Sequence, residues 1–290
     1  MFPREVRVRA LAYMRSARNV GYTLGALAGG IALAIGTRSA IMAVPILTGG
    51  LLILNALMVS RLPAIDRPAP PSHADEDDAT PAPPAWRNVG FVTLSVCNGI
   101  LNSNQILLNV VVPLWLVERT DAPHWTLAWL FGTNTVLCVL LQVPAARGMN
   151  TVSGALRGVR LATGCMVVSC AIIAATGDTI GWASVALLLI GHMTVTGAEL
   201  FESAAQWGFQ SELSDPARRG EYQGVTGLGR QVTNIIGPAA YTWLALDQGT
   251  LGWVVIATTI VVAAVLLHPA VRSAERFLAT HALDPAAATA

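Results

Sequence analysis

The chain has 290 residues, of which 53% are hydrophobic and only 12% are charged, and its formal net charge is +1. Soluble domains carry roughly 25% charged residues, so this composition, with a mean hydropathy of +0.55, excludes a soluble globular protein and indicates an integral membrane protein. We expect the lipid bilayer to surround it and no nucleic acid to be among its partners.

Eight stretches are long enough to cross a bilayer, which takes roughly 20 apolar residues. In chain order they cover 18–37, 39–60, 89–117, 124–146, 160–177, 180–201, 222–246 and 249–268. The first two and the last two are joined by very short turns, which are typical of antiparallel helical hairpins. The sequence therefore predicts an all-α integral membrane protein with about eight transmembrane helices.

The arginines orient these spans, because the cytoplasmic loops of membrane proteins are enriched in Lys and Arg. Arginines precede the first span, lie between spans two and three, and follow spans four, six and eight. The opposite side has only Arg38 and Arg119, and Arg230 lies inside a span. We therefore expect a multi-pass protein of the cell (plasma) membrane with both termini cytoplasmic.

The first span carries glycines at a spacing of four residues: Gly21, Gly25 and Gly29, followed by Gly30. Residues four apart lie on one helical face, and small residues at that spacing let two membrane helices approach closely. We expect these glycines to pack against another helix in a seam between two helical groups. The alternative is a lipid-facing stripe without a packing role.

The one long connection is "RLPAIDRPAPPSHADEDDATPAPPAWR", residues 61–87. Its prolines, small residues and acidic run cannot bury enough surface to fold, so we expect a disordered cytoplasmic linker rather than a cation site. The linker separates a two-helix segment, 1–60, from a six-helix segment, 88–270, which is followed by a cytoplasmic tail, 271–290. The four cysteines lie in apolar stretches, which favours buried hydrophobic roles and no metal site.

The third span is the richest in amides, with Asn98, Asn102, Gln105 and Asn109 at spacings of four, three and four residues. This spacing places them on one helical face. Because amides inside a membrane avoid lipid, we expect them to bind substrate, with pairing between packed helices as the alternative. The further candidates for substrate binding are Asn134, His192 and Asn234.

Three charged residues lie inside the last spans: Glu199 and Glu202 in the sixth and Arg230 in the seventh. Glu199 and Arg230 are expected at similar depth, and an unpaired charge there would be expensive, so we expect them to pair. The residues then form either a proton-coupling gate, which opens when a carboxylate takes up a proton, or a permanent ion pair that orients two helices. His192 is either protonatable or a neutral, hydrogen-bonded core residue.

An internal repeat links the two ends of the chain. "RNVGYTLGALA", residues 18–28, aligns with "RQVTNIIGPAA", residues 230–240, so that Arg, an amide, Val, Gly and Ala recur in register. Such repeats mark transporters built from related helical halves. The second copy contains Gly237 and Pro238, which we assign to helix packing.

Two spans, a long linker and six further spans resemble the last eight helices of the twelve-helix major facilitator superfamily. The resemblance implies family helices five to twelve with an incomplete N-terminal half. The four glycines resemble the G-x-x-x-G-P-x-x-G-G signature of drug–proton antiporters, although Ala26 replaces its proline, and "RRGEYQG" (residues 218–224) resembles an R-G-x-x-x-G loop of these exporters. In "QVPAARGMNTVSGALR", Ala146 stands where the family often has a gate aspartate.

The resemblance implies a secondary active transporter that exports small amphipathic compounds by alternating access. The sequence contains no enzyme signature and no cofactor motif, so we expect no enzyme and no cofactor, and coupling to an ion gradient, with protons as the coupling ion. Two alternatives are an N-terminally truncated fragment without transport and a membrane scaffold or accessory subunit completed by a partner chain that supplies the missing helices. Translating the DNA upstream of Met1 would separate these alternatives.

Overall fold

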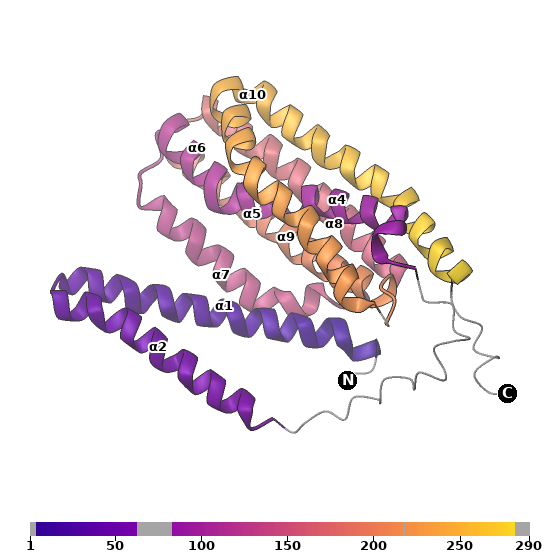
Figure 1. Ribbon diagram of the computed structural model, residues 1–290. Coiled ribbons are helices and arrows are strands. Elements are labelled where there is room, and N and C mark those ends of the chain that lie inside the picture. Colours follow the sequence, from indigo (N-terminus) through magenta and orange to yellow (C-terminus); the bar gives the residue numbers. More distant parts are fainter. Residues whose placement is uncertain (1–3, 63–82, 217, 282–290) are drawn as a thin grey trace. The chain divides into compact units, whose positions relative to one another are not determined.

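The computed structural model describes residues 4–62, 83–216 and 218–281 (Figure 1). Every regular element in this part of the chain is a helix, which confirms the predicted all-α fold. The chain divides into two compact units, one comprising Met1–Ala17 and Ala82–Ala290 and the other Arg18–Pro81. Each unit is described by itself below.

The first two helices form the predicted hairpin. α1 covers Arg4–Ile35 and α2 covers Arg38–Ser60. Gly36 between them has φ 67°, a left-handed conformation that glycine adopts without steric cost, and Thr37 caps α2 by accepting a hydrogen bond from the Ala40 N–H. α1 begins well before the predicted span at residue 18, so one helix contributes its first part to the larger unit and the rest to the smaller one.

The larger unit is a helical bundle. Its elements are η1 (Ala85–Arg87), α4 (Val89–Leu101), α5 (Asn104–Ile106), η2 (Leu107–Val111), α6 (Val112–Arg119), α7 (Thr126–Ala145), α8 (Val152–Ala175), η3 (Thr176–Asp178), α9 (Trp182–Glu212) and α10 (Arg219–His281). α10 packs on α4 and α8, and α9 packs on α7 and α8. The predicted linker largely lies outside the described residues, and α10 continues into the segment predicted as a tail.

Six elements of the described chain are long and apolar enough to cross a membrane: α2, α4 to α6 together, α7, α8 with η3, α9, and α10. α10 contains both of the last two predicted spans. They are separated at Gly249, where the backbone leaves the helical conformation with φ 57° and ψ −132°. The first predicted span, 18–37, overlaps α1, which ends at Ile35 and is not one of these six elements. The helices thus cover all eight predicted stretches.

The third predicted span is interrupted, which its sequence did not indicate. α4 ends at Leu101, a short turn leads into α5, and the five residues of η2 form a π-helix before α6 begins. A π-helix adds residues to a turn and changes which side chains share a face. Side chains spaced three or four residues apart across this region therefore do not all lie on one face of the helix.

A close crossing of α4 and α10 fixes the bundle beside this interruption. A Cβ atom added to Gly99 would lie 2.3 Å from the Gly229 carbonyl oxygen, and one added to Gly229 would lie 2.4 Å from the Ser95 carbonyl oxygen. The two helices thus touch through their backbones. Near the start of both helices Phe91 and Tyr222 pack edge to face with ring centroids 4.6 Å apart. These contacts set the position of α10, and with it Arg230.

Candidate functional site

A buried ion pair lies at the centre of the candidate site. Glu199 of α9 is 6% exposed, and its Oε1 lies 2.5 Å from Nη2 of Arg15 on α1. Ser16 strengthens the attachment of α1 by donating a hydrogen bond to the Val139 carbonyl of α7 at 3.1 Å. Because both charges are largely removed from solvent, each depends on the other to offset its desolvation.

A polar ladder between α7 and α9 holds Glu199 from the other side. Asn134 donates from Nδ2 to Glu199 Oε2 at 3.0 Å and to the Thr196 hydroxyl at 3.1 Å. The Cys138 thiol lies 3.6 Å from the same Glu199 oxygen. One turn further along, Gln142 donates to the Ser203 hydroxyl at 3.3 Å. Both carboxylate oxygens of Glu199 are therefore bound, one by Arg15 and the other by α7.

A second buried carboxylate lies almost one turn beyond the first. Glu202 is 2% exposed, and its Oε1 has no hydrogen-bond partner among the described residues. Arg230 and Arg15 are the cations whose charges act on it. Arg230 itself donates to the Gln206 side chain, one turn further along α9.

These contacts correct the expected pairing of Glu199 with Arg230. Glu199 is paired with Arg15, and Arg230 donates to Gln206 on the same helix as Glu199. The cluster thus brings two carboxylates and two guanidinium groups together in a buried region. When both carboxylates are ionised, the four groups sum to no net charge, so uptake of one proton by either carboxylate gives the cluster a net charge of +1 and removes the ionised partner of one guanidinium group.

An apolar contact lies next to this cluster where the family often has an aspartate. Ala146 at the end of α7 is 5% exposed and packs with Ala12 of α1, Met149 and Ala204. The absent carboxylate is therefore replaced by small side chains that let α1 approach α7 and α9. The ion pair of Arg15 with Glu199 is the polar contact of this approach.

The amides of the third span do not share one environment. Asn98 and Asn102 are buried, Gln105 is half-buried, and Asn109 is exposed and donates to the Gln105 carbonyl of its own helix at 2.8 Å. The interruption between α4 and η2 separates the four side chains that regular helical spacing placed together. Asn104, which the sequence analysis did not select, is fully buried and accepts a hydrogen bond from Gln105 at 3.0 Å.

The remaining candidates for substrate binding divide in the same way. His192 is fully buried, packs edge-on against Phe131, and its ring nitrogens meet no hydrogen-bond partner in the described structure. Asn134 belongs to the polar ladder. Asn234 is exposed on α10. Of these three residues, the structure brings only Asn134 into direct contact with the charged cluster.

The glycines assigned to packing also have different surroundings. A Cβ on Gly237 would lie 2.3 Å from the Ile106 side chain, so this glycine permits a close approach of α5, and Pro238 follows it inside α10. A Cβ on Gly21, Gly25 or Gly29 would meet no atom within 4 Å. Gly30 continues α1. The seam expected for the glycines of α1 stays a prediction.

Several residues of the site were missed by the sequence analysis. Arg15 was counted only as a loop charge, and Cys138 only as a buried hydrophobic residue. One signal was available: polar residues recur every four positions on α7, at Asn134, Cys138 and Gln142, and a similar row lies on α9. Two such rows predict helices joined by hydrogen bonds.

Comparison with protein families agrees with this architecture. The model of the Major Facilitator Superfamily matches residues 1–238, which include the ion pair, the polar ladder and the crossing of α4 with α10. No curated protein matches the chain in a search with its sequence. Members of this family are membrane transporters rather than enzymes, and they carry small molecules across the bilayer. The chain belongs to the Major Facilitator Superfamily and is a multi-pass membrane transporter.

Proposed function

We propose that the chain is a proton-coupled exporter of small amphipathic compounds, similar to the drug–proton antiporters, which works in the plasma membrane with both termini cytoplasmic. The observation that carries the proposal is the buried pairing of Glu199 with Arg15 beside the second carboxylate, Glu202. Intramembrane carboxylates take part in the proton relays of pumps and transporters, and charged residues at this depth pair with one another. The glycine signature of α1 supports export within the family.

The ion pair joins α1 to α9, and its state therefore couples protonation to helix movement. When the Glu199 carboxylate takes up a proton, it loses its negative charge, and its attraction to the Arg15 guanidinium falls to that of a neutral hydrogen bond. α1 can then separate from α7 and α9, which opens this end of the site. Loss of the proton restores the ion pair and closes it.

Glu202 serves as the second proton-exchanging group in this proposal. Its Oε1 is unpartnered, so protonation costs no existing hydrogen bond at that oxygen. Arg230, which donates to Gln206, can move its guanidinium to Glu202 when Glu199 is protonated. The two arginines thereby stay beside the two carboxylates, whether the gate is open or closed.

The amphipathic substrate would be bound by the amides of the bundle. Asn98 and Asn102 on α4 and Gln105 on α5 supply donors and acceptors, and the apolar helix faces between them accept a hydrophobic body. Substrate and proton exchange from opposite sides as the helical halves rock around this region. The expected partner chain is a separate prediction, tested by cross-linking in native membranes.

The test is transport by the chain reconstituted in liposomes that contain a trapped pH indicator. Ethidium, a small amphipathic cation, serves as the probe. With an imposed pH gradient, we expect ethidium to move against its concentration gradient while protons move in the opposite direction. Glu199→Gln removes the charge but keeps the shape, and should abolish both movements.

The control is Glu118→Gln, an exposed carboxylate at the end of α6 that lies outside the cluster. It should transport as the unmodified chain does. Unchanged proton-coupled transport in Glu199→Gln would overturn the proposed gate and leave the ion pair a purely structural contact. Ethidium movement without proton movement in the unmodified chain would overturn proton coupling.

A further inference from the structure

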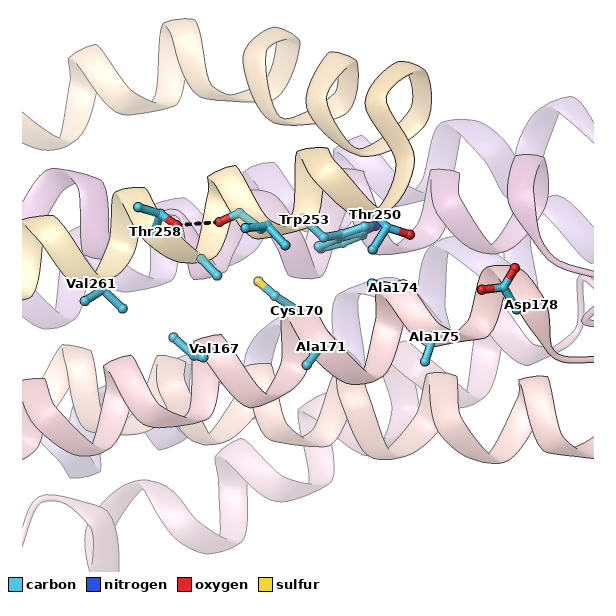
Figure 2. Close-up of a pocket in the computed structure, with 12 residues that line it drawn as sticks. Val167, Cys170, Ala171, Ala174, Ala175, Asp178, Thr250, Trp253, Thr258 and Val261 are labelled. Atoms are coloured by element: carbon cyan, nitrogen blue, oxygen red, sulfur yellow. Dashed lines mark hydrogen bonds between the residues drawn. The ribbon is translucent and has the colours of Figure 1, made fainter.

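A long groove lies between α8 and α10, away from the charged cluster (Figure 2). Its volume is about 580 Å³. One wall is a face of α8 and η3 that extends from Val167 to Asp178, and the other is a face of α10 that extends from Thr250 to Val261. Each wall spans twelve residues in sequence, and the eleven steps between the first and the last cover about 16 Å at 1.5 Å per helical residue.

The groove is apolar over most of its length. Alanines and valines from both helices line it, and Cys170 lies between them. Ala171 and Ala175 are exposed, so the small side chains leave open space on the outer surface of the bundle. Its length is about half of the 30 Å hydrocarbon core of a bilayer, which equals the reach of one acyl chain in one leaflet.

The carboxylate that lines the groove lies at one end, whereas Thr258 lies toward the other end and donates its hydroxyl to the Val254 carbonyl at 2.8 Å. Figure 2 shows Asp178, Thr250 and the Trp253 ring toward one end, and Val167 and Val261 toward the other. Asp178 and Thr250 lie at the turns that join consecutive spans, where α8 ends and the second part of α10 begins. These turns are at the level of the lipid headgroups, so the polar end meets headgroups and the apolar end meets acyl chains.

One donor at this end has no acceptor in the protein. The Trp253 side chain is 1% exposed, and its Nε1 has no hydrogen-bond partner among the described residues. The neighbouring Trp115, whose ring packs edge-on against it, does donate, to the Thr176 hydroxyl at 2.9 Å. An unpartnered buried N–H is costly, and a phosphate or ester oxygen of a lipid would satisfy it once the side chains that cover Nε1 move aside.

We propose that this groove is a binding site for one phospholipid with a primary amine in its headgroup. The acyl chain lies along the alanines and valines, the ammonium group pairs with the Asp178 carboxylate, and oxygens of the headgroup accept from Thr250 and Trp253. An anionic lipid without an amine has no partner for Asp178 and is repelled by it. On the predicted orientation, the site faces the outer leaflet.

The test is native mass spectrometry of the purified, delipidated chain titrated with phosphatidylethanolamine or phosphatidylglycerol of identical acyl composition. We expect phosphatidylethanolamine to bind more tightly by about fivefold, the upper end for an exposed ion pair. Asp178→Asn should remove this preference. Asp247→Asn, which changes an exposed carboxylate of α10 outside the groove, should keep it.

Two further variants separate the headgroup from the chain. Ala171→Phe fills exposed space in the groove and should reduce retention of both lipids, while Trp253→Phe should weaken retention with the preference kept. Equal retention of the two lipids by the unmodified chain would overturn the proposal. So would a preference that survives Asp178→Asn, unchanged lipid retention in Ala171→Phe, or displacement of the bound lipid by ethidium, which would make the groove a substrate site.

Discussion

Two pairs of neighbouring helices in the same bundle differ in the kind of side chain that lies between them. α7 and α9 meet through a polar ladder that includes the buried carboxylate of the ion pair, with hydrogen bonds from Asn134 and Gln142. α8 and α10 leave between them a groove lined by alanines and valines, with a carboxylate at one end. The first pair buries its polar groups among protein atoms, and the second presents apolar surface outward.

The difference shows how a membrane bundle separates its two kinds of surface. Polar side chains are expensive wherever lipid is the only neighbour, so they gather where helices from both sides can bind them. Alanine and valine cost nothing against acyl chains and leave room for them. The composition of a seam between two helices thus indicates whether it faces the interior or the lipid.

The largest effect is expected from breaking the ion pair. Arg15→Ala leaves the Glu199 carboxylate buried without its cation, which should cost about 3–5 kcal/mol of stability. The measurement is thermal unfolding in detergent. The double variant Arg15→Ala with Glu199→Gln should recover part of that loss, because no charge is left unpaired. Additive losses in the double variant would contradict a direct pairing.

The rungs of the polar ladder should differ in strength. Asn134→Leu removes a hydrogen bond to a charged carboxylate, which contributes about 1.5–3 kcal/mol, whereas Gln142→Leu removes one to a neutral hydroxyl, which contributes about 0.5–1.5 kcal/mol. Chemical denaturation of the two variants measures the difference. An equal loss in both would show that Asn134 does not bind the ionised form of Glu199.

Two of the four cysteines provide a matched pair: Cys138 lies between α7 and α9, and Cys170 lies between α8 and α10. Cys138→Ser replaces a thiol beside Glu199 by a stronger donor and should leave stability unchanged or raise it. Cys170→Ser buries a hydroxyl among apolar side chains and should cost about 1 kcal/mol. The melting temperatures of the two variants check this. A greater loss for Cys138→Ser would reverse the assignment of the polar and apolar seams.

The smallest effect is expected at the loops that precede α7 and α9. The Gly181 N–H, at the start of α9, donates to the Asp121 carboxylate at 2.5 Å, and this hydrogen bond lowers the pKa of Asp121 below its ordinary value. A lowered carboxyl pKa stabilises the fold above the ordinary value, near 3.9, and this contribution is lost as the pH falls through the lowered pKa. Melting temperatures from pH 3 to 6 measure it. Asp121→Asn should be less pH-sensitive than the unmodified chain, and an unchanged pH profile would contradict the contact.

The sequence predicted the helices better than the contacts between them. Apolar length and very short turns located the spans, including the turn that the structure places at Gly249. Local spacing also indicated that Glu199 needed a partner. It could not supply Arg15, because that residue is 184 positions away and only the packing of α1 on α9 brings it close. The amides of the third span differ in exposure because the turn after α4 and the π-helix η2 interrupt the regular spacing that the prediction assumed, and their role in substrate binding stays a prediction.

The glycines also show that contacts between helices could not be predicted from the local sequence. The conspicuous row at Gly21, Gly25 and Gly29 meets no neighbour within its unit, whereas Gly99 and Gly229, which form no local pattern, allow two backbones to touch. A close approach depends on which residues face each other across two helices. The sequence of a single helix gives the residues on only one side of such a contact.

The even spacing of the ladder has a consequence for how the chain tolerates changes in length. Its rungs join residues 134 with 196, 138 with 199 and 142 with 203, so the two helices run in parallel with a nearly constant offset. Deleting one residue between two rungs would turn everything beyond it by about 100° and remove every later rung together. Deletions in the loops before α8 and α9 leave the offset within each helix intact. The contact between α7 and α9 therefore tolerates changes in the length of the loops but not in the length of the two helices between the hydrogen bonds.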